Sequence, residues 1–216
     1  MSRCGKERVS FTRMKKKISF IYFDLGGVVI DNEQTKRGLA REFQLDTEAI
    51  QAFFDANWRE SCLGNLDNKA YLRDFKNAFG IEHPKDDFVD FITEYQGHYQ
   101  ETHDLIRELT GGYRLGILSN AELGTIDVLL RKGKIPDVKW DTLIESAQVR
   151  AVKPDRKIYD IAQKHAGVSP DEILFIDDRK PNIDAALSLG WNAELFDYFD
   201  LNRSVQRIKT KLHKKK

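Results

Sequence analysis

Four groups of polar residues in this 216-residue sequence are of the types that transfer a phosphoryl group. They are Asp24, Ser119 with Asn120, Lys153, and Asp177 with Asp178. A carboxylate that follows a buried strand can attack phosphorus and form an aspartyl-phosphate. Two or three acidic oxygens suit Mg²⁺, which takes few protein ligands together with phosphate oxygens. A lysine and a hydroxyl can neutralise and position the transferring oxygens. The set therefore predicts phosphoryl transfer.

These residues need a scaffold that brings them together, and the apolar pattern predicts one. Five β-branched or apolar runs are typical of strands, at residues 18–25, 113–118, 142–145, 173–176 and 193–196. Helical patterns at about 122–132, 154–166 and 181–189 lie between them. Strands that alternate with helices indicate an α/β fold, a doubly wound parallel sheet with a Rossmann-like core. In such sheets, sites form at the carboxyl ends of the strands, which is where the polar groups stand.

An insertion interrupts this alternation. Apolar residues between about 33 and 110 recur at helical spacing, so we expect an all-helical insertion seated over the sheet. The predicted organisation is a discontinuous core at 18–32 and 108–202, a helical cap at 33–107, and basic terminal segments at 1–17 and 203–216.

The net charge of +1 hides an uneven distribution of charge. Residues 1–17 and 203–216 each hold seven Lys and Arg with Glu7 as their single acid, and the body between them carries −12. This layout argues against a nucleic-acid-binding core. We expect the ends to be solvated tails, so that residues 14–202 alone would keep the activity. With 41% hydrophobic and 32% charged residues, the chain is typical of neither a disordered nor a membrane protein.

The cysteines and the first apolar run indicate a cytoplasmic protein. Two cysteines, Cys4 and Cys62, exclude a disulfide-dense secreted scaffold. The apolar run after Lys17 is interrupted by Asp24 and lacks a small-residue cleavage site, unlike a signal peptide. No stretch is long enough to span a bilayer, so we expect no membrane partner.

The four motifs, in this order and over about residues 18–200, resemble the haloacid dehalogenase superfamily of phosphohydrolases. The quoted motifs are Phe-Asp24-Leu-Gly26-Gly27-Val, Leu-Ser119-Asn120, Lys153-Pro-Asp, and Asp177-Asp178-Arg-Lys-Pro-Asn182. The resemblance implies that Asp24 is the nucleophile and that Ser119 and Lys153 contact the phosphoryl group. It also implies an Mg²⁺ site and a helical cap between the first two motifs. The implied metal ligands are Asp24, the Gly26 carbonyl, Asp178, Asp177 and Asn182.

The sequence departs from that family at Gly26. Typical family phosphatases carry an aspartate there, which protonates the leaving oxygen and then activates water. General acid–base catalysis contributes roughly 10²–10⁴-fold, so simple alkyl phosphates should be poor substrates. An anomeric sugar oxygen is a better leaving group, and the Asp-Leu-Gly motif resembles a bacterial subgroup that includes α-D-glucose-1-phosphate phosphatases. We therefore predict an Mg²⁺-dependent hydrolase of small phosphorylated metabolites, such as a sugar 1-phosphate.

Two alternatives stay open at this point. The site is either weakened, in a ligand-binding relative without catalysis, or it cleaves carbon–halogen bonds. The 2-haloacid dehalogenases of the superfamily also lack the second aspartate, because their ester-forming step expels halide without a proton. They need no metal, however, and the pair Asp178 and Asn182 argues against them.

Further residues are candidates either for contact with the substrate or for a structural role. Gly27 and Asn120 are expected near the phosphate, and Asp177 is expected to orient Lys153 or a metal-bound water. Trp58 and Arg59, in a cap turn, are candidate contacts to a sugar or organic group. The structural predictions concern Asp31 as a capping carboxylate, Cys62 as a small buried residue, and His83, His98, His103 and His165 as surface residues. We expect a monomer or homodimer whose partner is the small phosphorylated metabolite.

Overall fold

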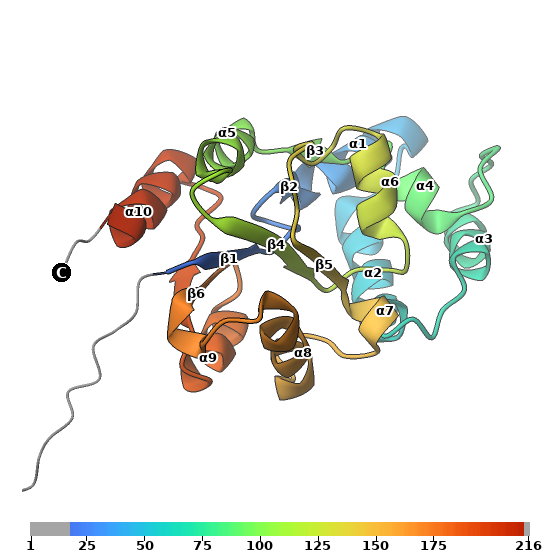
Figure 1. Cartoon of the computed structure of the whole chain (residues 1–216). Helices are drawn as coiled ribbons and strands as arrows, with labels where there is room; N and C mark the ends of the chain where they lie inside the picture. Colours follow the sequence, from blue (N-terminus) through green and yellow to red (C-terminus); the bar gives the residue numbers. More distant parts are fainter. Residues whose placement is uncertain (1–17, 214–216) are drawn as a thin grey trace, which may run out of the picture.

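The computed structural model describes residues 18–213, and a five-stranded parallel sheet lies at its centre (Figure 1). The strands are β1 (Phe20–Phe23), β4 (Arg114–Ser119), β5 (Thr142–Glu145), β6 (Ile173–Asp177) and β7 (Asn192–Leu195). Their order is β5-β4-β1-β6-β7, and every neighbouring pair is parallel. The chain winds away from β1 in both directions, so the crevice opens at the carboxyl ends of the central strands. The expectations for residues 1–17 lie outside the described residues.

Helices cover both faces of the sheet, as predicted for a doubly wound fold (Figure 1). On one face pack α5 (Gln100–Leu109), α6 (Thr125–Arg131) and α10 (Leu201–His213). On the other pack α8 (Arg156–Ala166) and α9 (Lys180–Ser188). Two short elements complete the core, α7 (Ser146–Val149) and the 3-10 turn η1 (Pro170–Glu172).

β1 shows why the sheet needs both layers. All four of its side chains are fully buried. Ile21 and Phe23 join the apolar cluster under α5, α6 and α10, whereas Phe20 and Tyr22 join the cluster under α8 and α9. Such an unbroken apolar run is typical of a parallel strand that is covered on both faces.

The insertion is helical and has a core of its own. Its helices are α1 (Asn32–Phe43), α2 (Thr47–Cys62), α3 (Asn68–Phe79) and α4 (Phe88–Ile92). An aspartate caps each helix start with its side chain, as Asp31 does for α1 by accepting from Gln34 N at 2.9 Å. Their apolar faces form a separate cluster of buried residues, Leu39, Ile50, Tyr71, Leu72, Phe75, Phe88, Phe91 and Ile92. This insertion is called the cap below.

The cap leaves and re-enters the core at a two-stranded antiparallel ribbon. The ribbon pairs β2 (Ile30–Asp31) with β3 (Gly97–His98). The sequence predicts a cap that runs to residue 107 and so includes most of the following helix, α5. In the structure, however, Leu105, Ile106 and Leu109 of α5 are buried in the core cluster. The boundary therefore falls at the ribbon, because the apolar face of α5 packs on the sheet and not on the cap.

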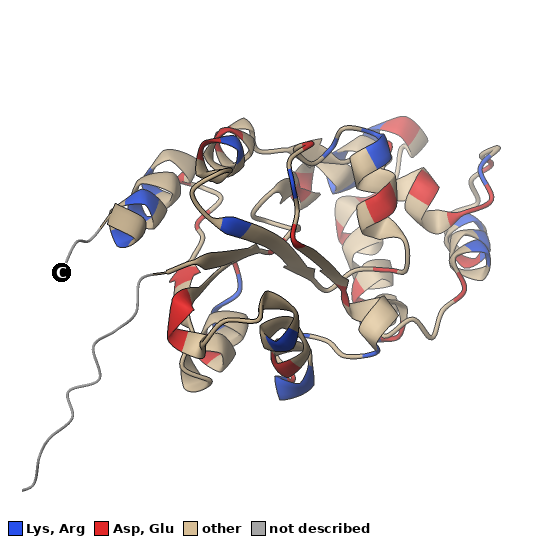
Figure 2. Cartoon of the chain, viewed as in Figure 1, with Lys and Arg blue, Asp and Glu red and all other residues tan. Residues whose placement is uncertain are grey.

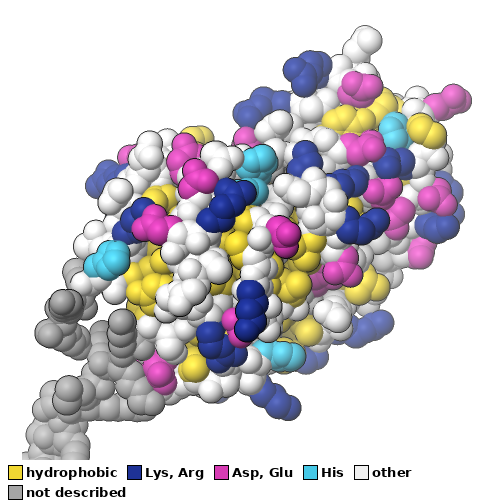
Figure 3. Space-filling model, turned by 45° about the horizontal axis from the view of Figure 1, so that its top comes forward, with side chains coloured by type: hydrophobic (Ala, Val, Ile, Leu, Met, Phe, Trp, Pro, Cys, Tyr) yellow, Lys and Arg dark blue, Asp and Glu magenta, His cyan; other side chains and the backbone are white. Residues whose placement is uncertain are grey.

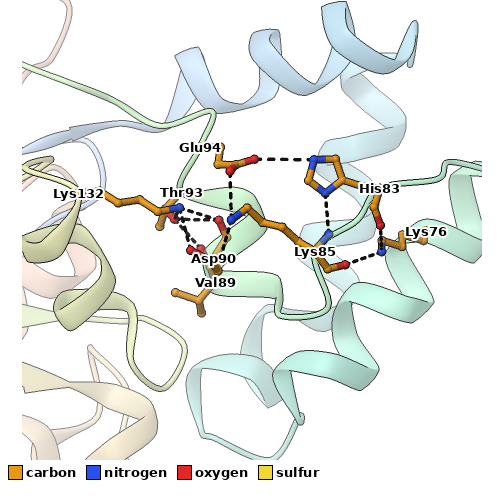
Figure 4. Close-up of polar contacts among 8 residues, drawn as sticks. All are labelled: Lys76, His83, Lys85, Val89, Asp90, Thr93, Glu94 and Lys132. Carbon is orange, nitrogen blue, oxygen red and sulfur yellow. Dashed lines mark hydrogen bonds and ion pairs between the residues drawn. The ribbon is translucent and has the colours of Figure 1, made fainter.

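Lysines of the core hold the cap at its α4 end (Figure 4). Lys132, at the end of α6, donates to the Asp90 carbonyl at 2.7 Å and to Thr93 Oγ1 at 2.8 Å, and its Nζ lies 3.0 Å from the Asp90 carboxylate. Lys134 donates to the Gln96 carbonyl at 2.7 Å. These contacts join the core to the segment that leads from α4 back to the ribbon.

The basic C-terminal segment differs from the expectation of a solvated tail. Its described part forms most of α10, whose Val205, Ile208 and Leu212 are buried in the core cluster. Its cations are paired with the acidic body: Arg207 lies 2.9 Å and Lys211 2.7 Å from Glu194 oxygens. An apolar stripe under the charges explains the difference, because burial of that stripe ties the helix to α5 and β7.

Charges of both signs alternate over the surface. Figure 2 shows Lys and Arg beside Asp and Glu on most helices, and Figure 3 shows the same mixture on the face it presents. On that face the cations are interspersed with acidic and apolar side chains. No helix within residues 18–213 is both long and apolar enough to cross a membrane.

Candidate active site

Asp24 lies directly after β1, at the carboxyl edge of the sheet. Its backbone N donates to the Ile176 carbonyl at 2.9 Å, which fixes the residue between β1 and β6. Its Oδ1 accepts from Leu25 N at 2.7 Å and lies 2.9 Å from Lys153 Nζ. Within the described chain no hydrogen bond is made to Oδ2, so this oxygen is the one placed to attack a substrate.

Lys153 is almost fully buried and stands between two carboxylates. Its Nζ lies 2.9 Å from Asp24 Oδ1 and 2.7 Å from Asp177 Oδ2. Burial alone would lower the pKa of this ammonium, but the two carboxylates outweigh it and raise the pKa above its ordinary 10.5. Lys153 is therefore a fixed positive charge at the place where phosphoryl oxygens would bind.

Asn120 holds the loop that carries this lysine. Its Oδ1 accepts from Lys153 N at 2.8 Å, and its Nδ2 donates to the Lys153 carbonyl at 3.0 Å. Sequence reasoning expected Asn120 near the phosphate. The structure places it at the cavity, but both ends of its amide are already bound to the Lys153 backbone.

Three carboxylates meet beside Lys153. One oxygen each from Asp24, Asp177 and Asp178 lies within 4.8 Å of the others. Burial raises the pKa of Asp24 to about 7 and that of Asp178 to about 6, because charged carboxylates here lose water and repel one another. A hard divalent cation relieves both effects and prefers oxygen ligands. The donor set therefore fits Mg²⁺.

Asp177 is oriented by its neighbours on the same loop. Asn182 Nδ2 donates to its two carboxylate oxygens at 3.0 and 3.1 Å, and Arg179 N donates to Oδ1 at 2.8 Å. Asp177 Oδ2 also accepts from Lys153 Nζ, so Asp177 positions the lysine. Asn182 thus reaches the acidic group through Asp177.

The two glycines after Asp24 make room for other side chains. Gly27 has a φ of +74°, and a Cβ there would lie 2.3 Å from Asp178 Oδ2, so a side chain would displace that carboxylate. A Cβ on Gly26 would lie 2.5 Å from Asn32 Nδ2. The space where related phosphatases carry an acid is therefore partly filled by the Asn32 amide, a residue that sequence reasoning missed.

A cavity of about 350 Å³ lies between the core and the cap; Asp178 of the acidic group lines it, whereas Asp24, Lys153 and Asp177 do not. Its core wall includes Gly26, Gly27, Ser119, Asn120 and Asp178. Its cap wall mixes polar side chains with four aromatic ones, Phe54, Trp58, Tyr71 and Phe88. Ser119, at the end of β4, is buried at this floor. A cavity of this size, with polar groups on its floor, could take a small ligand at the sheet edge under the cap.

The two cap residues proposed as substrate contacts differ in placement. Trp58 lines the cavity, and the Arg179 guanidinium lies 5.5 Å from the centre of its ring. Arg59 is exposed, lies 3.7 Å from the Asp155 carboxylate and does not line the cavity. A one-residue step along α2 turns the side chain by about 100°, so the two neighbours cannot share a face.

Sequence reasoning also missed further polar residues of the cavity wall, among them Gln96, Glu122 and Thr125. The one feature of the sequence that could have drawn attention to Glu122 is its position three residues after Ser119. Cys62 is buried as expected, whereas His103, expected at the surface, is buried and stacked on His98 with ring centres 4.3 Å apart.

Comparisons with known proteins identify the family and the fold of the chain. A protein-family model described as a haloacid dehalogenase-like hydrolase matches residues 18–190. An (S)-2-haloacid dehalogenase of Pseudomonas putida is 25% identical over 82% of this chain and 83% of its own. The pyrophosphatase PpaX of Bacillus velezensis is 27% identical over 81% of each chain. A solved HAD family enzyme of Bacteroides thetaiotaomicron, in complex with magnesium and inorganic phosphate, superposes with a TM-score of 0.68 at 21% identity, covering 84% of this chain and 95% of that one.

Proposed function

Because the chain belongs to the haloacid dehalogenase-like hydrolase family, we propose that it is an Mg²⁺-dependent phosphatase of small phosphorylated metabolites, such as a sugar 1-phosphate. The observation that carries this proposal is the packing of Asp24, Asp177 and Asp178 within 4.8 Å of one another around the Lys153 ammonium. Three carboxylates exceed what one lysine neutralises, and a divalent cation would complete the balance. The pyrophosphatase relative and the neighbour crystallised with magnesium and phosphate support the same chemistry.

In this proposal each residue has a separate task. Asp24 Oδ2 attacks phosphorus and forms an aspartyl-phosphate, which water then hydrolyses. Lys153 Nζ and the Ser119 hydroxyl bind the transferring oxygens. Asp24, Asp178 and the Gly26 carbonyl would hold Mg²⁺, with Asp177 and Asn182 orienting the site. The bound cation would offset the repulsion between an anionic nucleophile and an anionic substrate.

The cavity walls favour a neutral, hydroxyl-bearing leaving group. Two buried side-chain oxygens that belong to cavity residues, Gln96 Oε1 and Thr125 Oγ1, have no hydrogen-bond partner within residues 18–213. Buried polar groups of this kind are costly unless a ligand or water satisfies them. Lys36 is the single Lys, Arg or His among the described lining residues, and it already binds Glu33 and Gln51 at 2.6 and 2.9 Å. A second anionic group on the substrate would therefore find no free cation.

Carbon–halogen cleavage is the second candidate, supported by the haloacid dehalogenase relative and by the glycine at position 26. That reaction uses the same attack by Asp24 but expels halide instead of an alkoxide. It gives no role to the acidic group beside Lys153, which is why we rank it below the phosphatase. Halide release from a 2-haloacid in the presence of EDTA would reverse that order.

The test is release of inorganic phosphate from α-D-glucose 1-phosphate, glycerol phosphate and p-nitrophenyl phosphate, with Mg²⁺ and with EDTA. We expect turnover of the sugar and aryl phosphates with Mg²⁺, and none with EDTA. Asp24→Asn should lower turnover by about three orders of magnitude or more, because an amide is a poor nucleophile. The control is Asp184→Asn, on the exposed side of α9. Equal activity in EDTA would refute the metal, and an active Asp24→Asn enzyme would refute the nucleophile.

A further inference from the structure

One carboxyl of the cavity is unused by the chemistry described so far. The described lining residues with carboxyl groups are Glu33, Asp55, Asp178 and Glu122. Asp178 belongs to the acidic group, Glu33 is paired with Lys36, and Asp55 is exposed and accepts from Gln51. Glu122 remains, and it forms no ion pair with a described lysine, arginine or histidine.

Glu122 lies at the seam between core and cap. It belongs to the loop after β4, three residues beyond Ser119, and its Oε1 accepts from Ser61 Oγ of α2 at 3.2 Å. The loop is fixed from below, because Gly124 N and Ile126 N donate to the Glu145 carboxylate at 2.9 and 2.5 Å. Glu122 is thus held on the same wall of the cavity as the proposed phosphoryl contact, facing the space for the leaving group.

The surroundings of Glu122 favour its protonated form over the carboxylate. Among residues 18–213 the ionisable groups that face it are Cys62 of α2, Tyr71 of α3 and Glu145 of β5, and none of them is cationic. Burial raises the pKa of Glu122 above its ordinary 4.5. An enzyme that lacks an acid at Gly26 needs another proton donor near the leaving oxygen, and a cavity-lining carboxyl with a raised pKa suits that role.

We propose that Glu122, supported by Ser61, is the general acid and base of this site, in place of the absent side chain at residue 26. As Asp24 Oδ2 forms its bond to phosphorus, the bond from phosphorus to the leaving oxygen breaks, and that oxygen takes the proton of Glu122. In the second step the Glu122 carboxylate accepts a proton from the attacking water. The water oxygen bonds to phosphorus, the bond to Asp24 breaks, and the acid is restored. This inference rests on the proposed phosphatase function.

The decisive variant is Glu122→Gln, assayed on two substrates that differ in their need for a proton. Glycerol phosphate has a poor leaving group, and loss of the acid should lower its kcat/KM by roughly 10²–10⁴-fold. The p-nitrophenolate of p-nitrophenyl phosphate leaves without protonation, so kcat/KM for this substrate should fall by less than about fivefold. The high-pH limb of the wild-type rate profile, which reports the protonated acid, should disappear in the variant. If glycerol phosphate turns over too slowly to measure, glucose 1-phosphate replaces it.

A matched control is Asp127→Asn, an exposed carboxylate on the first turn of α6. It should leave both substrates unchanged. Ser61→Ala, which removes the contact to Oε1, should shift the high-pH limb without abolishing it. An equal loss on both substrates, or no loss on either, would overturn the role of Glu122. Failure of the wild-type enzyme to release phosphate from any substrate would instead refute the proposed function itself.

Discussion

At the scale of single residues, the glycine at position 26 removes an acid and also leaves space for the side chain of Asn32. Related phosphatases carry an aspartate there, but in this chain a Cβ would lie 2.5 Å from Asn32 Nδ2. Asn32 begins α1, the first helix of the cap, so its amide reaches back to the catalytic loop. The glycine and the asparagine therefore form a pair, and one cannot be replaced by a larger side chain without adjustment of the other.

We expect this pair to be visible in double variants. In a Glu122→Gln background, where the proposed acid is absent, Gly26→Asp alone should raise kcat/KM for glycerol phosphate by less than about threefold, because the Asn32 amide occupies the space of the new side chain. Gly26→Asp with Asn32→Ala opens the space and should raise it by at least about tenfold, a fraction of the value of a general acid. Asn32→Ala alone is the control. A full gain in the single variant would show that the amide moves freely.

Residue-scale prediction from sequence succeeded where chemistry and chain position coincide. Asp24 and Asp177 stand at strand ends, Lys153 lies on the loop before α8, and the structure brings the three into contact. Glu122 and Asn32 could not be selected in the same way. Both are ordinary polar residues in the sequence, and their importance comes from the cap, whose position over the sheet no local pattern specifies.

At the scale of elements, α5 carries a histidine in an unusual environment. His103 is buried, its Nε2 has no hydrogen-bond partner within the described chain, and its ring stacks on His98 of β3. Burial lowers the pKa of His103 to about 4, with smaller contributions from His98 and Arg107. The surface placement expected from sequence was wrong because α5 is amphipathic and His103 lies one turn before the buried Ile106 and Leu109.

This histidine should make the fold sensitive to acid. The unfolded chain binds a proton at His103 near pH 6.5, but the folded chain binds it only near pH 4, so stability is lost as pH falls through this window. His103→Phe keeps a ring on His98 and cannot titrate. We expect the free energy of unfolding of the wild type to fall relative to the variant between pH 6.5 and 4, and to differ by a constant amount above pH 7. Denaturation at several pH values measures this. An exposed histidine, His165→Gln, is the control, and parallel curves for wild type and His103→Phe would contradict the prediction.

The connection of cap to core also belongs to the scale of elements. Figure 4 shows Lys132 reaching from α6 to Asp90 and Thr93 of the α4 end, beside the pairing of Lys85 with Asp90 and Glu94. At the opposite end of the cap, Ser146 Oγ donates to the Cys62 carbonyl at 2.6 Å. The cap is thus anchored on both sides of the cavity, which keeps its wall of polar and aromatic side chains over the proposed phosphoryl site. Helical periodicity predicted the helices of the cap, whereas these anchors depend on three-dimensional placement alone.

At the scale of the whole molecule, the charge layout suggested an acidic body with two dispensable basic ends. The structure changes this for the C-terminal end, because the cations of α10 bind acids of the body. Arg207 and Lys211 share Glu194, and Lys209 pairs with Glu108 of α5. The sequence showed a row of lysines and arginines, and the apolar residues between them were too few to stand out. Their spacing of three and four residues nevertheless places them on one face.

Removal of α10 should therefore unfold the protein, because the helix contributes part of the core. Val205, Ile208 and Leu212 are buried, and each such side chain contributes about 1.5–3 kcal/mol. Together they approach the roughly 5–15 kcal/mol that stabilises a typical domain. We expect a chain of residues 18–202 to be insoluble or to lack a cooperative thermal transition, and Ile208→Ala in the full chain to lose about 2–4 kcal/mol. Replacement of Arg207 by Gln, at the partly exposed edge, should cost less than about 1 kcal/mol. A folded, active 18–202 chain would show that the core does not need α10 for stability. The expectation from the sequence that this end is dispensable would then stand.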